Sequence, residues 1–319
     1  MTRKRAMKAE SCAALLKAQD RILLVTHRNP DGDTMGSAAA LCSALRRCGK
    51  TAYLFPNRQV IAKLLPFVEH FYAPAEFTPD YVITVDVATE KMFADGFSGS
   101  VDLCIDHHPS NSHYAADELI DPDRAATGEI VLDVIRALCA SLTKDEADLL
   151  YIALTTDCGC FQYANTDAHA LRTAAELLEA GADNSRLNQL FFRKVSAARL
   201  KLEGLIYNSM SFYKDGKVVF AIVTDEMLTQ AGATEDDCED LASLPGKVRG
   251  NQVGITVREL EPGKCKVSVR TGPDVNSAEL CARFGGGGHP MAAGCTLNTD
   301  PEIAALLMQA ALNEAWPET

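Results

Sequence analysis

The sequence lacks an excess of positive charge, long apolar runs and internal repeats. Its 319 residues include 31 Lys and Arg against 43 Asp and Glu, which gives a formal net charge of −12. A protein that binds long nucleic acid through the phosphate backbone needs a broad basic face, so we expect no duplex DNA partner. A membrane-spanning helix requires about 20 consecutive apolar residues. No run approaches that length, and we expect no membrane partner.

A disulfide framework is not indicated either, although cysteines are plentiful. The eleven cysteines are odd in number and scattered, which is typical of small buried residues rather than of paired bridges. The stretch 1–10 is charged and has no apolar region behind it, so it does not resemble a signal peptide. These features predict a cytoplasmic location.

The length exceeds what a single hydrophobic core usually organises, so we expect two domains. Up to about residue 180, β-branched runs alternate with stretches of helical periodicity, the pattern of a doubly wound, mainly parallel α/β sheet. We predict strands at 21–26, 51–55, 81–86 and 101–105, and helices at 33–48, 127–140, 144–156 and 166–180.

The remainder of the chain predicts a smaller α/β domain with a mixed sheet. Residues 185–207 are expected to form one bridging helix. Strands are predicted at 217–224, 252–259 and 264–271, and helices at 234–244, 276–284 and 301–314. The resulting division is a catalytic, metal-binding domain over 1–184, a linker helix over 185–211 and a substrate-binding domain over 212–319.

Residues suited to metal ligation or phosphate contact fall in four short runs in the first half of the chain: His27, Asp31, Asp33, Asp86, His107, His108 and Asp157. Each run follows an apolar stretch. If the first three stretches are neighbouring parallel strands, these side chains converge at the sheet edge where open α/β sheets bind ligands. Each Asp alone is better explained as a helix cap or strand end, but their joint arrangement favours a site.

Four carboxylates brought together repel one another, since even two sharing a site raise one pKa strongly. Two divalent cations would cancel the four negative charges. Oxygen and imidazole ligands suit Mn²⁺, Mg²⁺ or Fe²⁺, and the absence of an interleaved thiolate argues against structural zinc. Among these metals, Mn²⁺ is the one that we expect.

The run from His27 to Asp33, together with Asp86, the Asp-His-His run ending at His108, and Asp157, resembles the four motifs of the DHH phosphoesterase superfamily. The stretch 284–294, Phe-Gly-Gly-Gly-Gly-His-Pro-Met-Ala-Ala-Gly, is similar to the glycine-rich signature of the DHH-associated C-terminal domain. Length and motif order resemble the nanoRNase A type. That type degrades very short oligoribonucleotides and dephosphorylates 3′-phosphoadenosine 5′-phosphate (pAp).

The resemblance implies a role for each candidate. His27 and Asp31 would hold one cation, with Asp33, His107 and Asp157 on the second and Asp86 bridging both. A hydroxide between the two metals would attack phosphorus in line. His108 would face the substrate and could protonate the leaving oxygen. Asp106 is expected either to orient a neighbouring imidazole or to be an ordinary strand-end residue.

The glycine-rich half implies substrate recognition. Four consecutive glycines suit a place where backbone N–H groups approach an anion, although a flexible loop is the plainer interpretation. A helix could begin at His289. By resemblance, the substrate's distal phosphate or base would be held across a cleft between the domains by Ser268, Arg270, Gly286, Gly287, Gly288 and His289.

The expected function is hydrolysis of short single-stranded RNA to 5′-mononucleotides, of pAp to AMP, or of both. Linear or cyclic dinucleotides such as pApA and c-di-AMP are alternative substrates. The glycine-rich signature disfavours a pyrophosphatase, and the full set of motif residues disfavours a catalytically silent nucleotide-binding module. The oligomeric state stays open, with a homodimer as one option.

Overall fold

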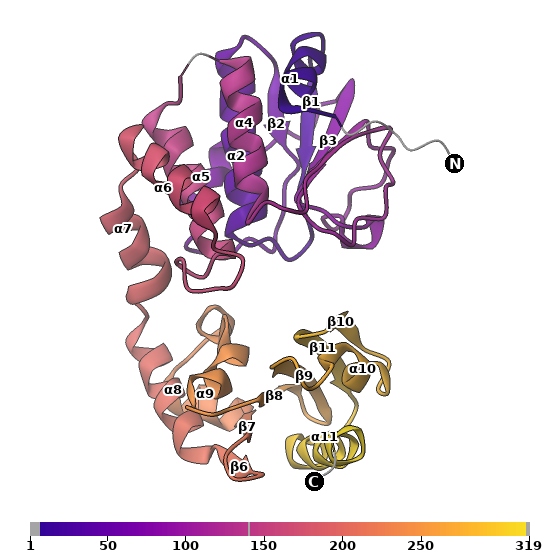
Figure 1. The fold of residues 1–319 in the computed structure, drawn as a ribbon, viewed down its shortest axis with the longest axis vertical. Coiled ribbons are helices and arrows are strands. Elements are labelled where there is room, and N and C mark those ends of the chain that lie inside the picture. Colours follow the sequence, from indigo (N-terminus) through magenta and orange to yellow (C-terminus); the bar gives the residue numbers. More distant parts are fainter. Residues whose placement is uncertain (1–6, 140, 317–319) are drawn as a thin grey trace. The chain divides into compact units, whose positions relative to one another are not determined.

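The computed structural model describes residues 7–139 and 141–316, which form two compact units that divide between Lys194 and Val195 (Figure 1). The division lies inside the segment 185–211 that the sequence suggests as a linker. Most of the charged stretch 1–10 and the last residue of the predicted helix 127–140 lie outside the described residues. Among those described, no helix combines the length and apolar character needed to cross a membrane.

The first unit contains a parallel sheet and the helices that follow its strands. Its strands are β1 (Ile22–Val25), β2 (Ala52–Leu54), β3 (Tyr81–Val85), β4 (Leu103–Asp106) and β5 (Asp117–Ile120). Its helices are α1 (Ala9–Lys17), α2 (Gly32–Arg47), α3 (Leu65–Val68), α4 (Thr127–Leu138), α5 (Lys144–Asp157), α6 (Ala168–Glu179) and α7 (Asn184–Asn188). Short 3₁₀ turns lie at Glu69–Phe71 and Glu90–Met92, and a π-helical turn lies at Gln189–Arg193.

The strand order in this sheet is β2-β1-β3-β4-β5, and all four pairs are parallel. The parallel sheet expected from the sequence is therefore confirmed. The chain passes from β1 outward to β2 and then returns to the other side of β1 as β3. This reversal of direction makes the carboxyl ends of β1 and β3 the topological switch point, where open α/β sheets bind their ligands.

The two faces of this sheet are covered differently. Alternate residues such as Ile22, Ile83 and Ile105 are fully buried in the core that α1, α2, α4 and α5 form on one face. On the opposite face, Val25 packs in a smaller cluster whose aromatic members come from loops, among them Phe97. Because strands β1, β3 and β4 are buried on both faces, they are nearly continuous apolar runs, which is why the sequence reveals them.

The second unit is built on a mixed sheet of order β10-β11-β9-β8-β7-β6, in which only β7 and β8 are parallel. Its strands are β6 (Ser211–Tyr213), β7 (Val218–Val223), β8 (Val253–Glu261), β9 (Lys264–Thr271), β10 (Gly287–His289) and β11 (Ala292–Leu297). Its helices are α8 (Ala197–Ser209), α9 (Asp225–Ala231), α10 (Ser277–Ala282) and α11 (Pro301–Ala315). The mixed sheet of a smaller second domain is confirmed.

Two predicted helices differ from the structure. The single helix expected over 185–207 is interrupted at 194–196, where Ser196 accepts a hydrogen bond from the Arg199 N–H and caps a new helix, α8. The helix expected over 234–244 is wrong, because two 3₁₀ segments, Glu235–Cys238 and Leu241–Lys247, stand in its place. Asp240 between them has φ +54°, a left-handed conformation that ends helical hydrogen bonding.

Candidate metal centre

The candidate residues of the first unit gather at the carboxyl edge of its sheet. His27 follows β1, Asp86 follows β3, and His107 and His108 follow β4. Asp31 and Asp33 lie at the N-terminus of α2, and Asp157 is the last residue of α5. The structure thus brings together seven side chains that lie up to 130 positions apart in the sequence.

Three overlapping groups within this cluster each offer ligand atoms close enough to share one cation. They are His27 with Asp31 and Asp86, Asp33 with His107 and Asp157, and Asp86 with His107 and His108. Nε2 of His27 lies 3.7 Å from the carboxylate of Asp31 and 3.8 Å from that of Asp86. Nε2 of His107 lies 3.7 Å from Asp86, 3.7 Å from Asp157 and 3.9 Å from Asp33. Both imidazoles therefore face carboxylates across gaps wide enough for an intervening ion.

Asp33 is held rigidly by the helix that begins opposite it. Its carboxylate accepts hydrogen bonds from the backbone N–H of Thr127 (2.7 Å) and Gly128 (2.9 Å) at the start of α4. The Ser37 hydroxyl donates a third bond at 2.9 Å. A helix N-terminus favours an anion at this position. Even so, burial, Asp157 and Asp31 together keep the pKa of Asp33 well above its usual range.

Asp86 lies at the centre of the cluster in an unusual backbone conformation. Its φ of +60° is rare for a residue with a side chain, and such outliers concentrate at functional sites. The Thr127 hydroxyl donates to its Oδ1 at 2.9 Å. Burial and the neighbouring carboxylates, Asp33 first, raise the pKa of Asp86 well above the ordinary value. Without cations, the cluster thus carries more negative charge than its surroundings compensate.

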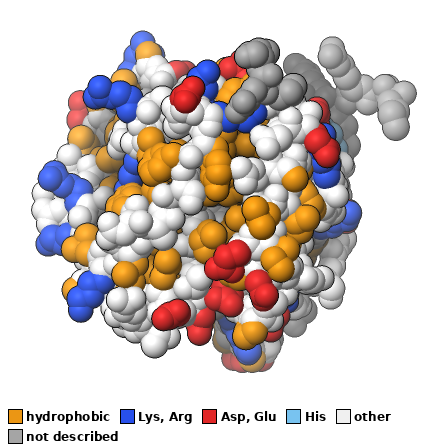
Figure 2. All heavy atoms as spheres, turned by 90° about the horizontal axis from the view of Figure 1, so that it is seen from below, with side chains coloured by type: hydrophobic (Ala, Val, Ile, Leu, Met, Phe, Trp, Pro, Cys, Tyr) orange, Lys and Arg blue, Asp and Glu red, His pale blue; other side chains and the backbone are white. Residues whose placement is uncertain are grey.

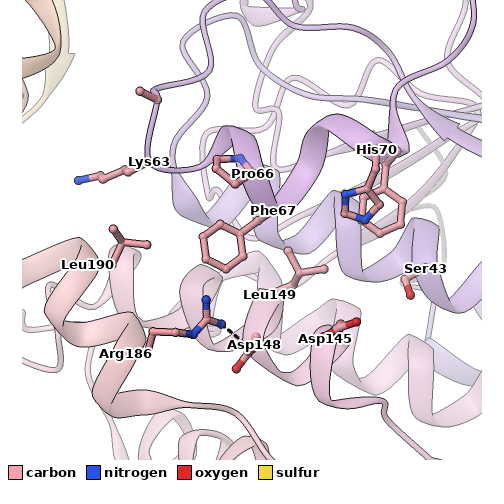
Figure 3. Close-up of a pocket in the computed structure, with 12 residues that line it drawn as sticks. Ser43, Lys63, Pro66, Phe67, His70, Asp145, Asp148, Leu149, Arg186 and Leu190 are labelled. Atoms are coloured by element: carbon pink, nitrogen blue, oxygen red, sulfur yellow. Dashed lines mark hydrogen bonds and ion pairs between the residues drawn. The ribbon is translucent and has the colours of Figure 1, made fainter.

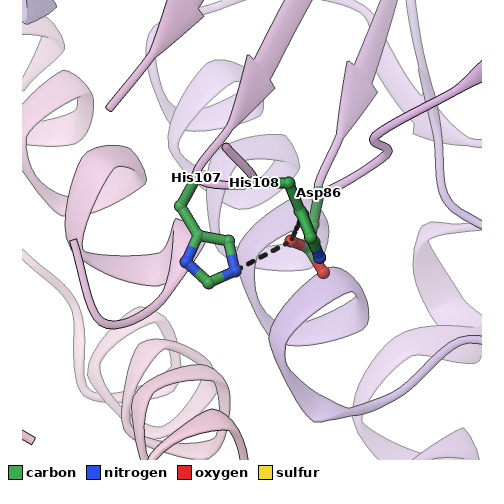
Figure 4. Close-up of side chains that lie close together, drawn as sticks. All are labelled: Asp86, His107 and His108. Atoms are coloured by element: carbon green, nitrogen blue, oxygen red, sulfur yellow. Dashed lines mark ion pairs between the residues drawn. The ribbon is translucent and has the colours of Figure 1, made fainter. Parts of the chain in front are cut away.

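The two adjacent histidines lie beside Asp86 (Figure 4), and each directs its Nδ1 to a different acceptor. Nδ1 of His107 lies 3.1 Å from the carbonyl oxygen of Arg124. A carbonyl can only accept, so Nδ1 carries the proton, and in the neutral ring Nε2 presents its lone pair to the carboxylates. Nδ1 of His108 is instead engaged by Asp106 at 2.7 Å, so it is not free to ligate a metal. Burial opposes protonation of His108, but Asp106 outweighs it and raises the pKa of this imidazole.

Asp106 is itself anchored, which decides between the two roles expected for it. It is fully buried, and it accepts bonds from Asn111 at 2.6 Å and from the His107 backbone N–H at 2.9 Å. Burial alone would raise the pKa of Asp106, but the bonds and charge of His108 and the Asn111 bond lower it. Asp106 is therefore an ionised acceptor that orients His108.

Close packing of two helices determines where Asp157 lies relative to Asp33. Helix α2 carries Asp33 in its first turn, and α5 ends at Asp157. Between them Gly36 faces the α5 backbone so closely that a Cβ at this position would lie 2.4 Å from the Leu149 carbonyl oxygen. Only glycine allows this approach.

The ordinary capping role accounts for part of this arrangement. Asp31 caps α2 by accepting from the Thr34 N–H at 3.1 Å. Capping does not explain why two imidazoles and three further carboxylates face the same space. Oxygen and imidazole donors with excess negative charge fit hard or borderline divalent cations. The residues present therefore fit a pair of such ions.

The candidate substrate-binding residues lie on the second unit and form a separate group at one edge of its sheet. Across β11, His289 and Arg270 both align with Ala292, and Gly287 and Ser268 both align with Gly294. Arg270 and His289 are exposed, Ser268 is half-buried, and Gly286 directly precedes β10.

The glycine-rich segment differs from its prediction. Gly287, Gly288 and His289 form strand β10, and no helix begins at His289. Gly288 has φ +146°, and a Cβ there would lie 2.5 Å from the Ala292 carbonyl oxygen, whereas Gly287 has nothing within 4 Å. Strand packing thus explains Gly288 without a ligand, and Gly287 remains without such an explanation.

Sequence reasoning missed the contacts that hold the cluster in place. Thr127, Gly128, Asn111 and the Arg124 carbonyl all bond to a candidate ligand or to its orienting residue. The contacts of Thr127 and Gly128 could have been found from the sequence, because a helix is predicted to begin at residue 127 and the first N–H groups of a helix can bind an anion.

A pocket of about 830 Å³ lies elsewhere in the first unit, between α3, α5 and α7 (Figure 3). Its apolar lining includes Phe67, Leu149 and Leu190, and Arg186 pairs with Asp148 at 2.8 Å. None of the seven clustered residues lines it, so the pocket is distinct from the candidate metal centre.

Comparison with known proteins places the chain in a family. The DHH family, N-terminal domain, matches residues 21–154, and the DHHA1 domain matches residues 215–315. The bifunctional oligoribonuclease and PAP phosphatase NrnA of Thermus thermophilus is 35% identical over 290 residues, covering 89% of this chain and 87% of that protein. The protein of the same name from Bacillus subtilis is 27% identical over 302 residues, covering 90% and 93%.

Solved structures agree with this at the level of the fold. An exopolyphosphatase-related protein from Bacteroides fragilis superposes with a TM-score of 0.86 at 23% identity, covering 96% of this chain and 95% of that one. Exonuclease RecJ bound to manganese has a TM-score of 0.56 at 16% identity, covering 100% and 97%. This chain therefore belongs to the DHH family and carries a DHHA1 domain in its second unit.

Proposed function

We propose that this protein is a metal-dependent phosphoesterase that hydrolyses short oligoribonucleotides to 5′-mononucleotides and pAp to AMP. The observation that carries the proposal is the 35% identity with the Thermus oligoribonuclease and PAP phosphatase along nearly its whole length. The clustered aspartates and histidines support it independently, because they supply the ligand set that phosphoester hydrolysis with two metals requires.

His27 and Asp31 would hold one divalent cation, and Asp33, His107 and Asp157 the other, with Asp86 between the two. This assignment uses two of the three groups of ligand atoms found in the cluster. Two cations would neutralise the carboxylates, activate water and stabilise charge on the phosphoryl oxygens. Mn²⁺ is the metal that we propose, with Mg²⁺ or Fe²⁺ as alternatives.

His108 is the proposed proton donor to the leaving oxygen. Its Nδ1 is engaged by Asp106, so Nε2 is the nitrogen left to meet a substrate. Because Asp106 raises the pKa of His108, a larger share of the imidazole is protonated near neutral pH than in an isolated histidine. The direction of this shift suits a general acid.

The second unit is proposed to bind the part of the substrate that does not react. Arg270 can make a bidentate contact to a phosphate, which Lys cannot. The residues proposed for this role share one sheet edge: Ser268, Arg270, Gly286, Gly287, Gly288 and His289. Arg270 and the stretch 287–289 are exposed, as a recognition surface requires.

Small or single-stranded substrates agree best with the charge of the chain, and a cytoplasmic location is part of the proposal. The net charge of −12 disfavours a long duplex. On the face seen in Figure 2, Lys and Arg side chains are scattered and separated by apolar and acidic ones.

The test is a ranking of kcat/KM in Mn²⁺ for pApA, a long single-stranded RNA, a duplex DNA, pAp and pyrophosphate. We expect pApA and pAp to lead. A higher value for pyrophosphate or for duplex DNA would contradict the proposal. Asp86→Asn protein, purified in parallel, controls for contaminating nucleases.

A further inference from the structure

The orientation of His107 depends on a carbonyl group in the loop between β5 and α4. The bond from Nδ1 of His107 to the Arg124 oxygen is the contact that turns Nε2 toward Asp33, Asp86 and Asp157. The same loop leads into Thr127 and Gly128, which hold Asp33. The contacts that hold residue 124 in place therefore also determine where His107 and Asp33 lie.

The Arg124 side chain is bound on three sides. Its guanidinium donates to Asp121 at 3.0 Å, to Asp133 at 3.1 Å and to the His169 ring. The side chain is 23% exposed, so this charge is largely withdrawn from water. A withdrawn, multiply bonded guanidinium differs from an ordinary surface ion pair, which contributes little.

Behind Arg124 lies a carboxylate that the cluster does not use. Glu129 in α4 is 1% exposed, and its Oε1 lies 2.6 Å from Nδ1 of His169. Its other oxygen accepts from the Ala125 N–H at 2.8 Å. With Nδ1–H of His169 directed to Glu129, the other ring nitrogen can accept from Arg124. A buried carboxylate persists only when it is bonded in this way.

A second connection runs from the same loop to the end of α5. The Asn165 side-chain amide donates to the Ala125 oxygen at 3.0 Å and to the Asp157 backbone oxygen at 3.1 Å. The loop that orients His107 is thus tied to the residue that carries the facing carboxylate, Asp157.

We propose that Arg124 is a positioning residue for the proposed metal centre. Its guanidinium, held by Asp121, Asp133 and the Glu129–His169 pair, fixes the carbonyl that keeps His107 in one tautomer and one orientation. The inference rests on the proposed function in assigning His107 to a cation. It adds that the cation site of Asp33, His107 and Asp157 depends on Arg124, and that the site of His27 and Asp31 does not.

The experiment compares Arg124→Gln with Arg136→Gln. Arg136 pairs with the same Asp133, at 2.7 Å, but does not contact the loop. Mn²⁺ is titrated into metal-free protein by calorimetry. Imidazole ¹⁵N spectra of the same metal-free samples report the tautomer of His107. Thermal unfolding checks that each variant is folded.

We expect two Mn²⁺ sites in the unaltered protein. Arg124→Gln should lower the Mn²⁺ affinity of one site by about 10- to 100-fold, which is the usual effect of losing a contact that orients a ligand. The affinity of the other site should stay within about twofold of the parent value. The His107 ring should lose its single Nδ1–H tautomer. Arg136→Gln should change neither. His169→Gln, which removes one partner of the guanidinium, should give a smaller change in the same direction.

An unchanged two-site titration and an unchanged His107 tautomer in both Arg124→Gln and His169→Gln would overturn the inference. Equal weakening of both Mn²⁺ sites would also overturn it, because that result indicates general loosening. Failure of the unaltered protein to bind Mn²⁺ would instead count against the proposed function, and the tautomer in metal-free protein would still decide the role of Arg124.

Discussion

The Thr127 hydroxyl donates to Oδ1 of Asp86 at 2.9 Å, so the first residue of α4 bonds to the carboxylate at the centre of the cluster. The backbone of Asp86 also holds a φ of +60°, a conformation that is rare for a residue with a side chain. The bond directs one carboxylate oxygen and leaves the other facing His27.

Replacement of Thr127 by Val should therefore lower kcat on pApA by about tenfold or more, the scale expected for a residue that orients a ligand. Thr127→Ser retains the hydroxyl and should stay within about threefold of the parent. The measurement is kcat at saturating Mn²⁺. Equal losses in both variants would show that the methyl group, and not the hydrogen bond, matters.

Asp86→Asn should nearly abolish turnover, by about 10³-fold, because metal-assisted charge stabilisation contributes several kcal/mol. Without metal, the same variant should be more stable than the parent, since it removes a carboxylate whose pKa burial and neighbouring charges raise. Paired measurements of kcat and of thermal unfolding in chelator test both parts. A variant that loses activity and also unfolds at a lower temperature would contradict this expectation.

The free energy of unfolding of the metal-free protein should depend on pH through the protonation of Asp157. Burial raises the pKa of Asp157 from 3.8 to about 6, although His107 opposes the shift. Between these values the folded protein binds a proton that the unfolded chain has released. The stability that this proton contributes is therefore fully present below about pH 4 and is lost as the pH rises through 6, by about 3 kcal/mol.

The comparison that isolates this effect is Asp157→Asn against the parent, unfolded thermally in chelator from pH 4.5 to 7.5. The stability advantage of the variant should grow with pH. Since Mn²⁺ must displace the same proton, the affinity of the parent for Mn²⁺ should rise over the same range. A constant difference between the two proteins would disprove the assignment to Asp157.

Gly288 and Gly287 should respond differently to substitution by Ala. Gly288→Ala forces a side chain into φ +146° and against the Ala292 carbonyl, which should cost about 1–3 kcal/mol of stability. Gly287→Ala meets nothing within 4 Å and should fold normally. If the backbone at Gly287 approaches the substrate, the KM of the Gly287→Ala variant for pApA should rise while the unfolding midpoint of the variant stays constant.

Arg270→Ala and His289→Ala should raise KM for pApA by about tenfold or more, because a lost charge-assisted hydrogen bond costs about 1.5–3 kcal/mol. Cleavage of a small aryl phosphodiester, which has no distal nucleotide, should change little. Steady-state kinetics on both substrates makes the test. Equal losses on the two would remove the recognition role of the second unit.

Strands β1 to β4 and β7 to β9, together with the clustered side chains, could be predicted because each depends on local pattern. The run 22–25 is apolar throughout, and His27 and Asp31 follow closely after it in the sequence. Strand β5 was missed because Asp117 and Glu118 interrupt its apolar pattern. The contacts of Thr127 and Asn111 could not be predicted, since they depend on which elements meet in space. The helix predicted over 234–244 was wrong because Asp240 adopts a left-handed conformation, which the neighbouring residues in the sequence do not indicate.

The close contact of Gly36 with the α5 backbone connects the hydrophobic core to the reaction. The two helices that meet there carry Asp33 and Asp157, whose carboxylates are proposed to share a cation. Any larger residue at position 36 would push the helices apart and widen the cage around that ion. If Asp33 and Asp157 share a cation as proposed, its discrimination between ions of different radius would depend on a residue in the protein interior that is not among the proposed ligands.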